Sequence, residues 1–171
     1  PGGIISIEDE VFRSCTSLTS ITIPDSVTSI GYASFCSCYG LTSLDISESI
    51  ATIGDYAFSD CTSLTNVTIP EGVTTIGDGA FRICTSLTAI DVNVNNPNYA
   101  SVDGVLFNKA VTTLIQCPGG KEGAFIIPNG VTFIGGDAFN LCTSLTSVTI
   151  PDSVTSIDSN AFSDCTSLAS V

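Results

Sequence analysis

Cysteine is the residue type in this chain whose chemistry and spacing stand out first. Six of the eight cysteines recur at a step of 23 residues, in one run of four and one of two: Cys15, Cys38, Cys61 and Cys84, then Cys142 and Cys165. If copies of one segment stack like paired strands, equivalent side chains lie about 4.8 Å apart. A disulfide needs roughly 3.5–4.5 Å between Cβ atoms, and zinc needs ligands that converge as a tetrahedron. We therefore expect buried, reduced thiols and no metal or cofactor. The pair Cys36-Ser-Cys38 is only a weak metal motif.

Catalytic groups are hard to assemble from this composition. The chain has no histidine, which excludes Ser-His and Cys-His arrangements. A glycosidase needs two carboxyl groups about 5–9.5 Å apart. Acids do recur in two rows of the repeat: Asp25, Glu48, Glu71 and Asp152 in one, Asp55, Asp78 and Asp137 in the other. A catalytic pair should be unique, whereas these acids are copied from segment to segment. No calcium loop of the D-x-D-x-D-G type is present. We expect no enzyme.

The net charge of the chain excludes some classes of binding partner. Seventeen acids face only four basic residues, and the net charge is −13. Nucleic acids and anionic membranes require basic patches, so we expect neither as a partner. No apolar run approaches the 18 residues of a membrane span, and no signal segment opens the chain. The sequence starts and stops inside a repeat, which suggests a fragment of a longer protein.

The cysteines belong to a longer repeated unit, P-x-x-V-T-x-I-G-x-x-A-F-x-x-C-T-S-L-T-x-V-T-I. A fixed period of this length is typical of a solenoid. Its β-branched residues alternate with polar ones, which predicts half-buried parallel strands. We place them at Thr19–Ile23, Thr42–Ile46, Thr65–Ile69, Thr88–Val92 and Thr146–Ile150. The Gly-x-x-Ala-Phe segment predicts a short helical or 3₁₀ turn. Stacking should place the repeated Leu and Phe residues in two buried columns.

The expected fold is therefore a mainly-β member of the α/β repeat class, with a single core along residues 1–171. The coils should span about 1–23, 24–46, 47–69, 70–92, 128–150 and 151–171. Residues 93–127 break the period. Val105–Phe107 and Val111–Ile115 are strand-like, with a turn at Asn108–Ala110. We interpret this insertion as a hairpin-bearing coil that protrudes from the solenoid, not as a linker.

The unit I-P-x-x-V-T-x-I-G-x-x-A-F-x-x-C-x-S-L-T resembles the BspA-like leucine-rich repeat family. The insertion N-P-N-Y-x-S-x-D-G-V-L-F-N-K is similar to a variant module of that family. The resemblance implies a right-handed leucine-rich-repeat solenoid with its turns on the convex side. It also implies a secreted or cell-surface, virulence-associated protein that adheres to extracellular matrix such as fibronectin, to host cells or to other microbes. The family shares no catalytic residues.

Outward-facing strand positions offer the best candidate binding surface. They are Ser20, Thr22, Ser43, Asp45, Asn66, Thr68, Ala89, Asp91, Ser147 and Thr149. We expect a monomeric module that binds a protein or glycan here, weakly at each coil and by avidity over many coils. A spacer without a ligand is the alternative, and a polysaccharide-acting enzyme or an ice-binding threonine array are more remote ones. Solvated strands also favour threonine for no functional reason.

Overall fold

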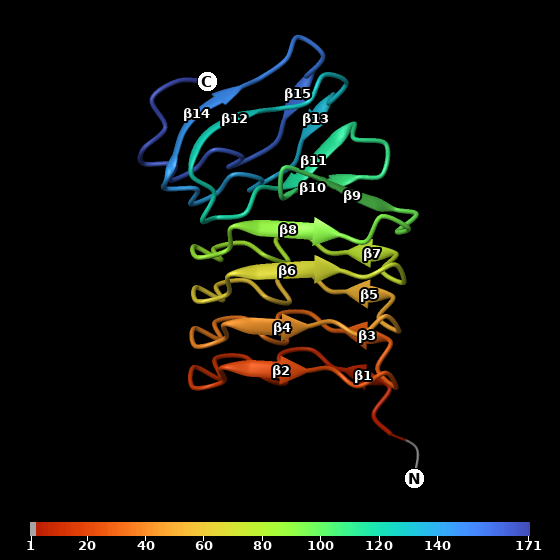
Figure 1. Cartoon of the computed structure of the whole chain (residues 1–171). Coiled ribbons are helices and arrows are strands. Elements are labelled where there is room, and N and C mark those ends of the chain that lie inside the picture. The colour runs from red at the N-terminus through yellow and green to blue at the C-terminus, as the bar shows by residue number, and fades with distance from the viewer. Residues whose placement is uncertain (1–2) are drawn as a thin grey trace.

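Each regular coil contains a long and a short strand in the computed structural model, which describes residues 3–171 (Figure 1). Pro1 and Gly2, at the start of the first predicted coil, lie outside the described residues. The long strands are β2 (Ser20–Thr22), β4 (Ser43–Asp45), β6 (Asn66–Ile69), β8 (Ala89–Val92), β12 (Gly123–Ile126) and β14 (Leu145–Thr149). The short strands are β1 (Ser6–Ile7), β3 (Ser29–Ile30), β5 (Thr52–Ile53), β7 (Thr75–Ile76), β13 (Phe133–Ile134) and β15 (Ser156–Ile157). The fold is a mainly-β solenoid of about seven coils.

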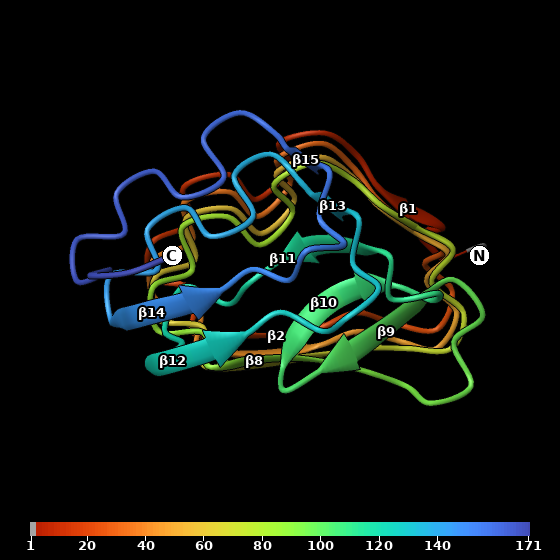
Figure 2. The ribbon, with the colours of Figure 1, turned by 90° about the horizontal axis from the view of Figure 1, so that it is seen from above.

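Parallel pairing of the long strands is confirmed within three pairs, β2–β4, β6–β8 and β12–β14, whereas the one continuous sheet that the sequence predicts is not formed. Ser20 pairs with Ser43 and Asn66 with Ala89, each 23 residues on. The short strands were not predicted as strands. They form a second parallel ladder, β1-β3-β5-β7, on another side of the stack (Figure 2). The segment Val-Thr-x-Ile therefore both turns the chain and pairs it with its neighbours.

The predicted helical turns are wrong, because no helix is present in residues 3–171. In the turn segment every second N–H donates to the next coil instead of to its own. Ala33 donates to the Asp55 carbonyl at 2.9 Å and Phe35 to that of Ala57 at 2.8 Å. Left-handed residues such as Ala33 (φ 47°) interrupt any helical run. Gly54 is required where coils approach, since an added Cβ would lie 2.7 Å from the Gly31 carbonyl carbon.

Repeated apolar side chains stack into columns, as the sequence predicts. The Phe35 and Phe58 rings are nearly parallel, with centroids 5.2 Å apart, and Phe58 and Phe81 follow at 5.6 Å. Leu41, Leu64 and Leu87 are fully buried. Full burial of one such side chain stabilises the fold by about 1.5–3 kcal/mol. Each coil therefore stabilises the next one by burying these apolar side chains between them.

The insertion contains three strands: β9 (Tyr99–Val102), β10 (Val105–Asn108) and β11 (Thr113–Gln116). The strands β9 and β10 form an antiparallel hairpin, and β10 pairs antiparallel with β11. The last strand then pairs parallel with β13, so it takes the short-strand place in its coil. That coil is abbreviated: residues 117–122 join its two strands, where residues 31–42 do so in a regular coil.

The prediction that the hairpin protrudes is wrong. Val105, Leu106 and Phe107 are fully buried, because an uninterrupted apolar run suits a strand covered on both faces. The expected single core is corrected as well. Leu106 packs into a first core that runs from Ile7 to Ile90, whereas Val105 and Phe107 pack into a second core. The strand β10 is therefore a wall shared by two cores.

Candidate binding surfaces

The strand face is formed by the outward side chains of β2, β4, β6, β8 and β14. Of the ten predicted positions, eight are exposed: Ser20, Thr22, Ser43, Asp45, Asn66, Thr68, Asp91 and Thr149. Ala89 and Ser147 are half-buried. Strand pairing aligns Thr22 with Asp45 and Thr68 with Asp91, which gives a regular column of small polar groups.

Strand β10 and its hairpin turn divide this surface into two parts. The turn of the β9–β10 hairpin lies against Ala89, where a Cβ added at Gly104 would be 3.0 Å from the Ala89 Cβ. Ser147 and Thr149 lie beyond it, beside Ala124 and Ile126 of β12. Ile126 is 71% exposed. The repeat did not point to Ile126, because β12 lies within the insertion. The structure therefore does not bring all ten positions together on one unbroken strip.

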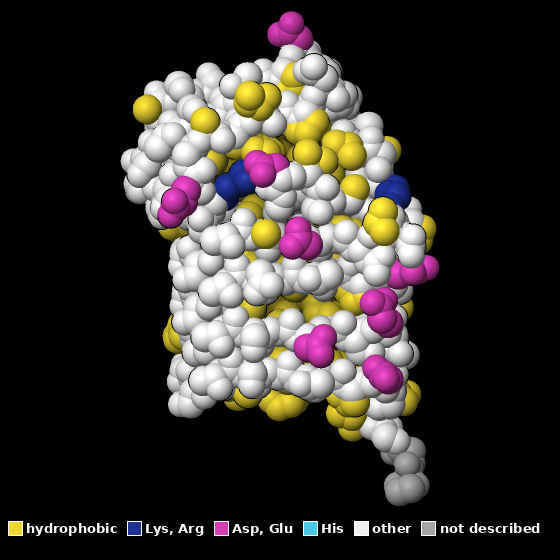
Figure 3. All heavy atoms as spheres, in the orientation of Figure 1, with side chains coloured by type: hydrophobic (Ala, Val, Ile, Leu, Met, Phe, Trp, Pro, Cys, Tyr) yellow, Lys and Arg dark blue, Asp and Glu magenta, His cyan; other side chains and the backbone are white. Residues whose placement is uncertain are grey.

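Electrostatics of the strand face are negative. Figure 3 shows mostly uncharged polar atoms over β2 to β8, with separate acidic side chains among them. Asp45 and Asp91 form no salt bridge within residues 3–171. Three of the four basic side chains are paired elsewhere, in Arg13–Glu10, Arg82–Asp137 and Lys121–Asp103. The carboxylates of Asp45 and Asp91 therefore remain free to attract a positively charged partner.

All eight cysteines are free thiols. In the ladder every Sγ except that of Cys15 points to a carbonyl of the coil before it, as Cys61 does to Phe35 at 3.3 Å and Cys84 to Phe58 at 3.1 Å. Burial raises the pKa of Cys61 and raises that of Cys84 to about 12. The prediction of six buried ladder thiols needs a correction, because Cys15 is exposed and Cys165 half-buried. Cys15 lies in the first coil, where no described residue covers it.

Three acids of the two rows accept hydrogen bonds from the next coil. Asp25 accepts a hydrogen bond from Ser47 at 2.7 Å, and Glu48 accepts one from the Glu71 N–H at 3.2 Å. Asp55 accepts the N–H of Asp78 at 2.9 Å. Within residues 3–171, no group of three or more Cys, Asp or Glu side chains could hold a metal ion. These three acids thus tie successive coils together.

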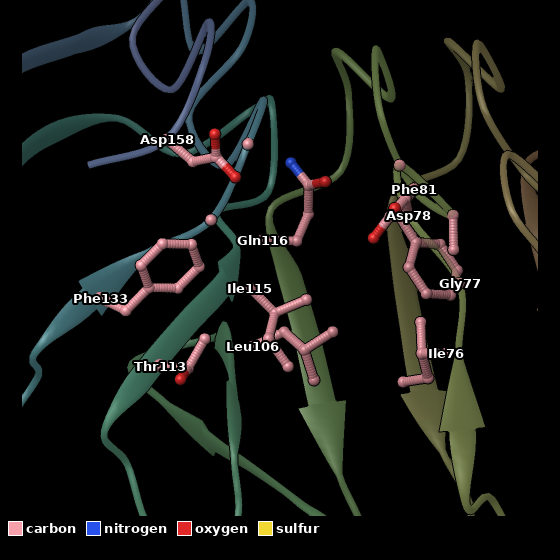
Figure 4. Close-up of a pocket in the computed structure, with 14 residues that line it drawn as sticks. Ile76, Gly77, Asp78, Phe81, Leu106, Thr113, Ile115, Gln116, Phe133 and Asp158 are labelled. Carbon is pink, nitrogen blue, oxygen red and sulfur yellow. The ribbon is translucent and has the colours of Figure 1, made fainter. Parts of the chain in front are cut away.

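A cleft that the sequence did not indicate opens between the two cores. Its volume is about 180 Å³, and it is lined from four strands, β7, β10, β11 and β13, and from the turns that follow Ile76, Ile134 and Ile157. We call it the junction cleft (Figure 4). The one feature of the sequence that could have indicated this cleft is the short connection after β11, where a regular coil has a longer turn.

No segment of residues 3–171 forms a helix that could cross a membrane.

The chain is similar to a known class of repeat. A model of the BspA type leucine rich repeat region matches in six copies, over residues 1–110 and 122–171. The unmatched residues 111–121 hold β11 and the abbreviated turn. No curated protein sequence matches the chain.

Solved structures show the same fold. A leucine rich cell surface protein from Faecalibacterium prausnitzii A2-165 is 38% identical with a TM-score of 0.88, over 95% of this chain and 43% of its own. The pneumococcal vaccine antigen PcpA is 32% identical with a TM-score of 0.88, over 94% of this chain and 40% of its own. A leucine-rich repeat protein from Eubacterium ventriosum is 26% identical with a TM-score of 0.60, over 88% and 59%. The chain thus spans less than half of the first two.

Proposed function

Because this chain belongs to the BspA-type leucine-rich repeat family, we propose that it is a non-catalytic recognition segment of a secreted or cell-surface protein. It binds a protein or glycan of a matrix or cell surface through the strand face. The observation that carries the proposal is the alignment of exposed side chains on paired strands, Thr22 with Asp45 and Thr68 with Asp91. The description of one similar structure as a cell surface protein supports the location.

The strand face favours a partner with a basic patch. Its acids are exposed, and the net charge of the chain is −13. Complementary potentials speed encounter and disfavour like-charged partners. Aromatic anchors, which dominate tight interfaces, are absent from the ten predicted positions. Binding at each coil is therefore weak, and the affinity depends on how many coils engage at once.

Charge reversal tests the proposal. The chain is immobilised, and binding of fibronectin, other matrix proteins and whole cells is measured at two salt concentrations. The double variant Asp45→Lys, Asp91→Lys should weaken binding by about tenfold or more while leaving the circular dichroism spectrum unchanged. The single variant Asp152→Lys is the control, because Asp152 is exposed and lies outside the predicted face.

Two results would count against the proposal. Binding that is equally weak in Asp152→Lys would show a response to net charge alone. Failure of every matrix protein and cell type to bind would favour the spacer instead, since a spacer needs only the solenoid.

A further inference from the structure

The junction cleft exists because one turn of the solenoid is missing. In a regular coil, Tyr56 and Phe58 donate their N–H groups to the carbonyls of Asp78 and Ala80 in the next turn. The equivalent N–H groups one coil later, on Gly79 and Phe81, donate no hydrogen bond within residues 3–171. The coil that should cover them passes from β11 directly to Cys117 and Pro118. The space left is the cleft of about 180 Å³.

The cleft has an apolar floor and a polar rim. Ile76, Leu106, Ile115 and Phe133 line the floor, and Asp78, Gln116 and Asp158 lie at the rim. Figure 4 shows Asp78 and Asp158 on opposite sides, with the Gln116 carboxamide between them. A neighbouring hollow of about 220 Å³ shares Asp78 and Asp158 and extends the opening toward Tyr56.

Asp78 does not bind the next coil, although the aspartates at the same position of earlier coils do. Asp9 accepts the N–H of Tyr32 at 2.8 Å, and Asp55 accepts the N–H of Asp78 at 2.9 Å. No turn lies above Asp78, and its carboxylate accepts no hydrogen bond within residues 3–171. The nearby guanidinium of Arg82 faces Asp137, at 3.4 Å between Nε and Oδ1. The Asp158 carboxylate accepts the Ser159 N–H at 2.7 Å. Neither Asp78 nor Asp158 forms a salt bridge within residues 3–171.

Gln116 supplies an independent acceptor. The residue is only 5% exposed. Its amide nitrogen is fixed by the Cys117 and Ala138 carbonyls, at 3.1 and 3.3 Å. The amide oxygen accepts no hydrogen bond from residues 3–171 and lies in the cleft (Figure 4). The oxygen is therefore free to accept a hydrogen bond from a donor group that enters the cleft.

We propose that the junction cleft binds an alkylammonium group on an apolar stem, as at the end of a lysine side chain. An ammonium carries three donors and no acceptor, which suits three separate acceptors on Asp78, Asp158 and Gln116. A guanidinium prefers a paired, planar partner, and the two carboxylates lie on opposite walls instead. The stem packs on Leu106 and Ile115, since lysine buries its methylene groups while its charge stays at a polar rim. The site is distinct from the strand face and does not depend on it.

Amide NMR of the intact chain tests the proposal with small probes. Nα-acetyl-lysine amide and 1,5-diaminopentane are titrated separately, with the Nε-acetylated lysine amide and norleucine amide as uncharged controls. Expected are shifts confined to residues 77–81, 116 and 135–136 with both amines, and none with the controls. Tighter binding of the lysine amide identifies a protein-borne lysine, since the free N–H groups of Gly79 and Phe81 can receive its carbonyl. Tighter binding of the diamine identifies a free polyamine as the source.

Matched variants separate the cleft from general attraction to an acidic protein. Asp78→Asn and Asp158→Asn should each weaken binding by about tenfold, whereas Asp152→Asn removes the same charge elsewhere and should not. All three positions are exposed, so the fold is retained and unchanged amides far from the cleft verify it. Equal weakening by all three variants, shifts spread over the surface, or no shifts at millimolar amine would each overturn the proposal.

Discussion

The ladder cysteines show how one side chain can both fill a core and donate a hydrogen bond to a backbone carbonyl. A thiol is small and apolar enough for a core, yet it is a weak donor. Cys38, Cys61 and Cys84 direct their Sγ atoms to the carbonyls of Phe12, Phe35 and Phe58. The Phe12 and Phe35 carbonyls also accept the backbone N–H groups of Cys15 and Cys38, at 3.2 and 3.3 Å, so the thiol is a second donor to each of them. Cysteine at this position therefore caps the turn of the coil before it.

Alkaline pH should destabilise the fold through these thiols. Burial raises the pKa of Cys84 from 9.0 to about 12, so the unfolded chain loses its thiol proton first. The stabilisation is complete below pH 9 and is lost as the pH rises from there toward about 12. Urea unfolding between pH 8 and pH 11 should show a falling free energy of unfolding, with a shallower fall in Cys84→Ala. An equally steep fall in that variant would contradict the assignment.

Asn96 is the residue that attaches the insertion to the regular coils. It is fully buried, and its amide nitrogen donates to the carbonyls of Pro70 and Val73 at 2.7 and 3.0 Å. Its amide oxygen accepts the N–H groups of Asn98 and Tyr99 at 2.9 and 2.8 Å. One side chain thereby replaces a strand pairing that the broken period cannot supply.

Replacing Asn96 should be costly. Asn96→Ala leaves buried backbone groups without partners, at about 1–3 kcal/mol for each group, and thermal unfolding should move to markedly lower temperature. Asn96→Asp keeps the acceptor but sets a carboxylate against the Pro70 and Val73 carbonyls, so it should also destabilise. Asn95→Ala is the control, because Asn95 is exposed. Similar melting of the Asn95 and Asn96 variants would refute the role.

At the scale of elements, the sequence predicted what repeats and missed what is set by neighbouring coils. The long strands follow from alternation of β-branched residues, and the predicted Thr65–Ile69 differs from β6 by one residue. The turn segment was misjudged because its N–H groups pair across coils, which no local pattern reveals. Strand β9 was missed since Tyr99–Val102 lacks alternation and is fixed by pairing with β10.

The candidate surfaces divide in the same way. Outward positions on β2 to β8 follow from a period of two, so the strand face could be named from the sequence. Ala89 differs only because the hairpin turn covers it. The junction cleft depends on the absence of a turn and on a strand inserted between two cores. Neither is visible without knowing which coil each residue joins.

At the scale of the molecule, β10 couples two stacks of coils. Its Leu106 side chain belongs to the first core, and Val105 and Phe107 belong to the second. Solenoids derive stability from interfaces between adjacent repeats. Here one interface is replaced by a strand that faces both ways, so the two stacks share a single wall.

Two substitutions on this wall should therefore loosen different halves of the chain. Leu106→Ala should cost about 2–5 kcal/mol and Phe107→Ala about 3–5 kcal/mol, because both side chains are fully buried. Hydrogen exchange by mass spectrometry should show faster exchange in β6 and β8 for Leu106→Ala, and in β13 and β14 for Phe107→Ala. Faster exchange over the whole chain in both variants would instead show one cooperative unit. Val102→Ala, on the exposed side of the hairpin, provides the control and should leave both stacks protected.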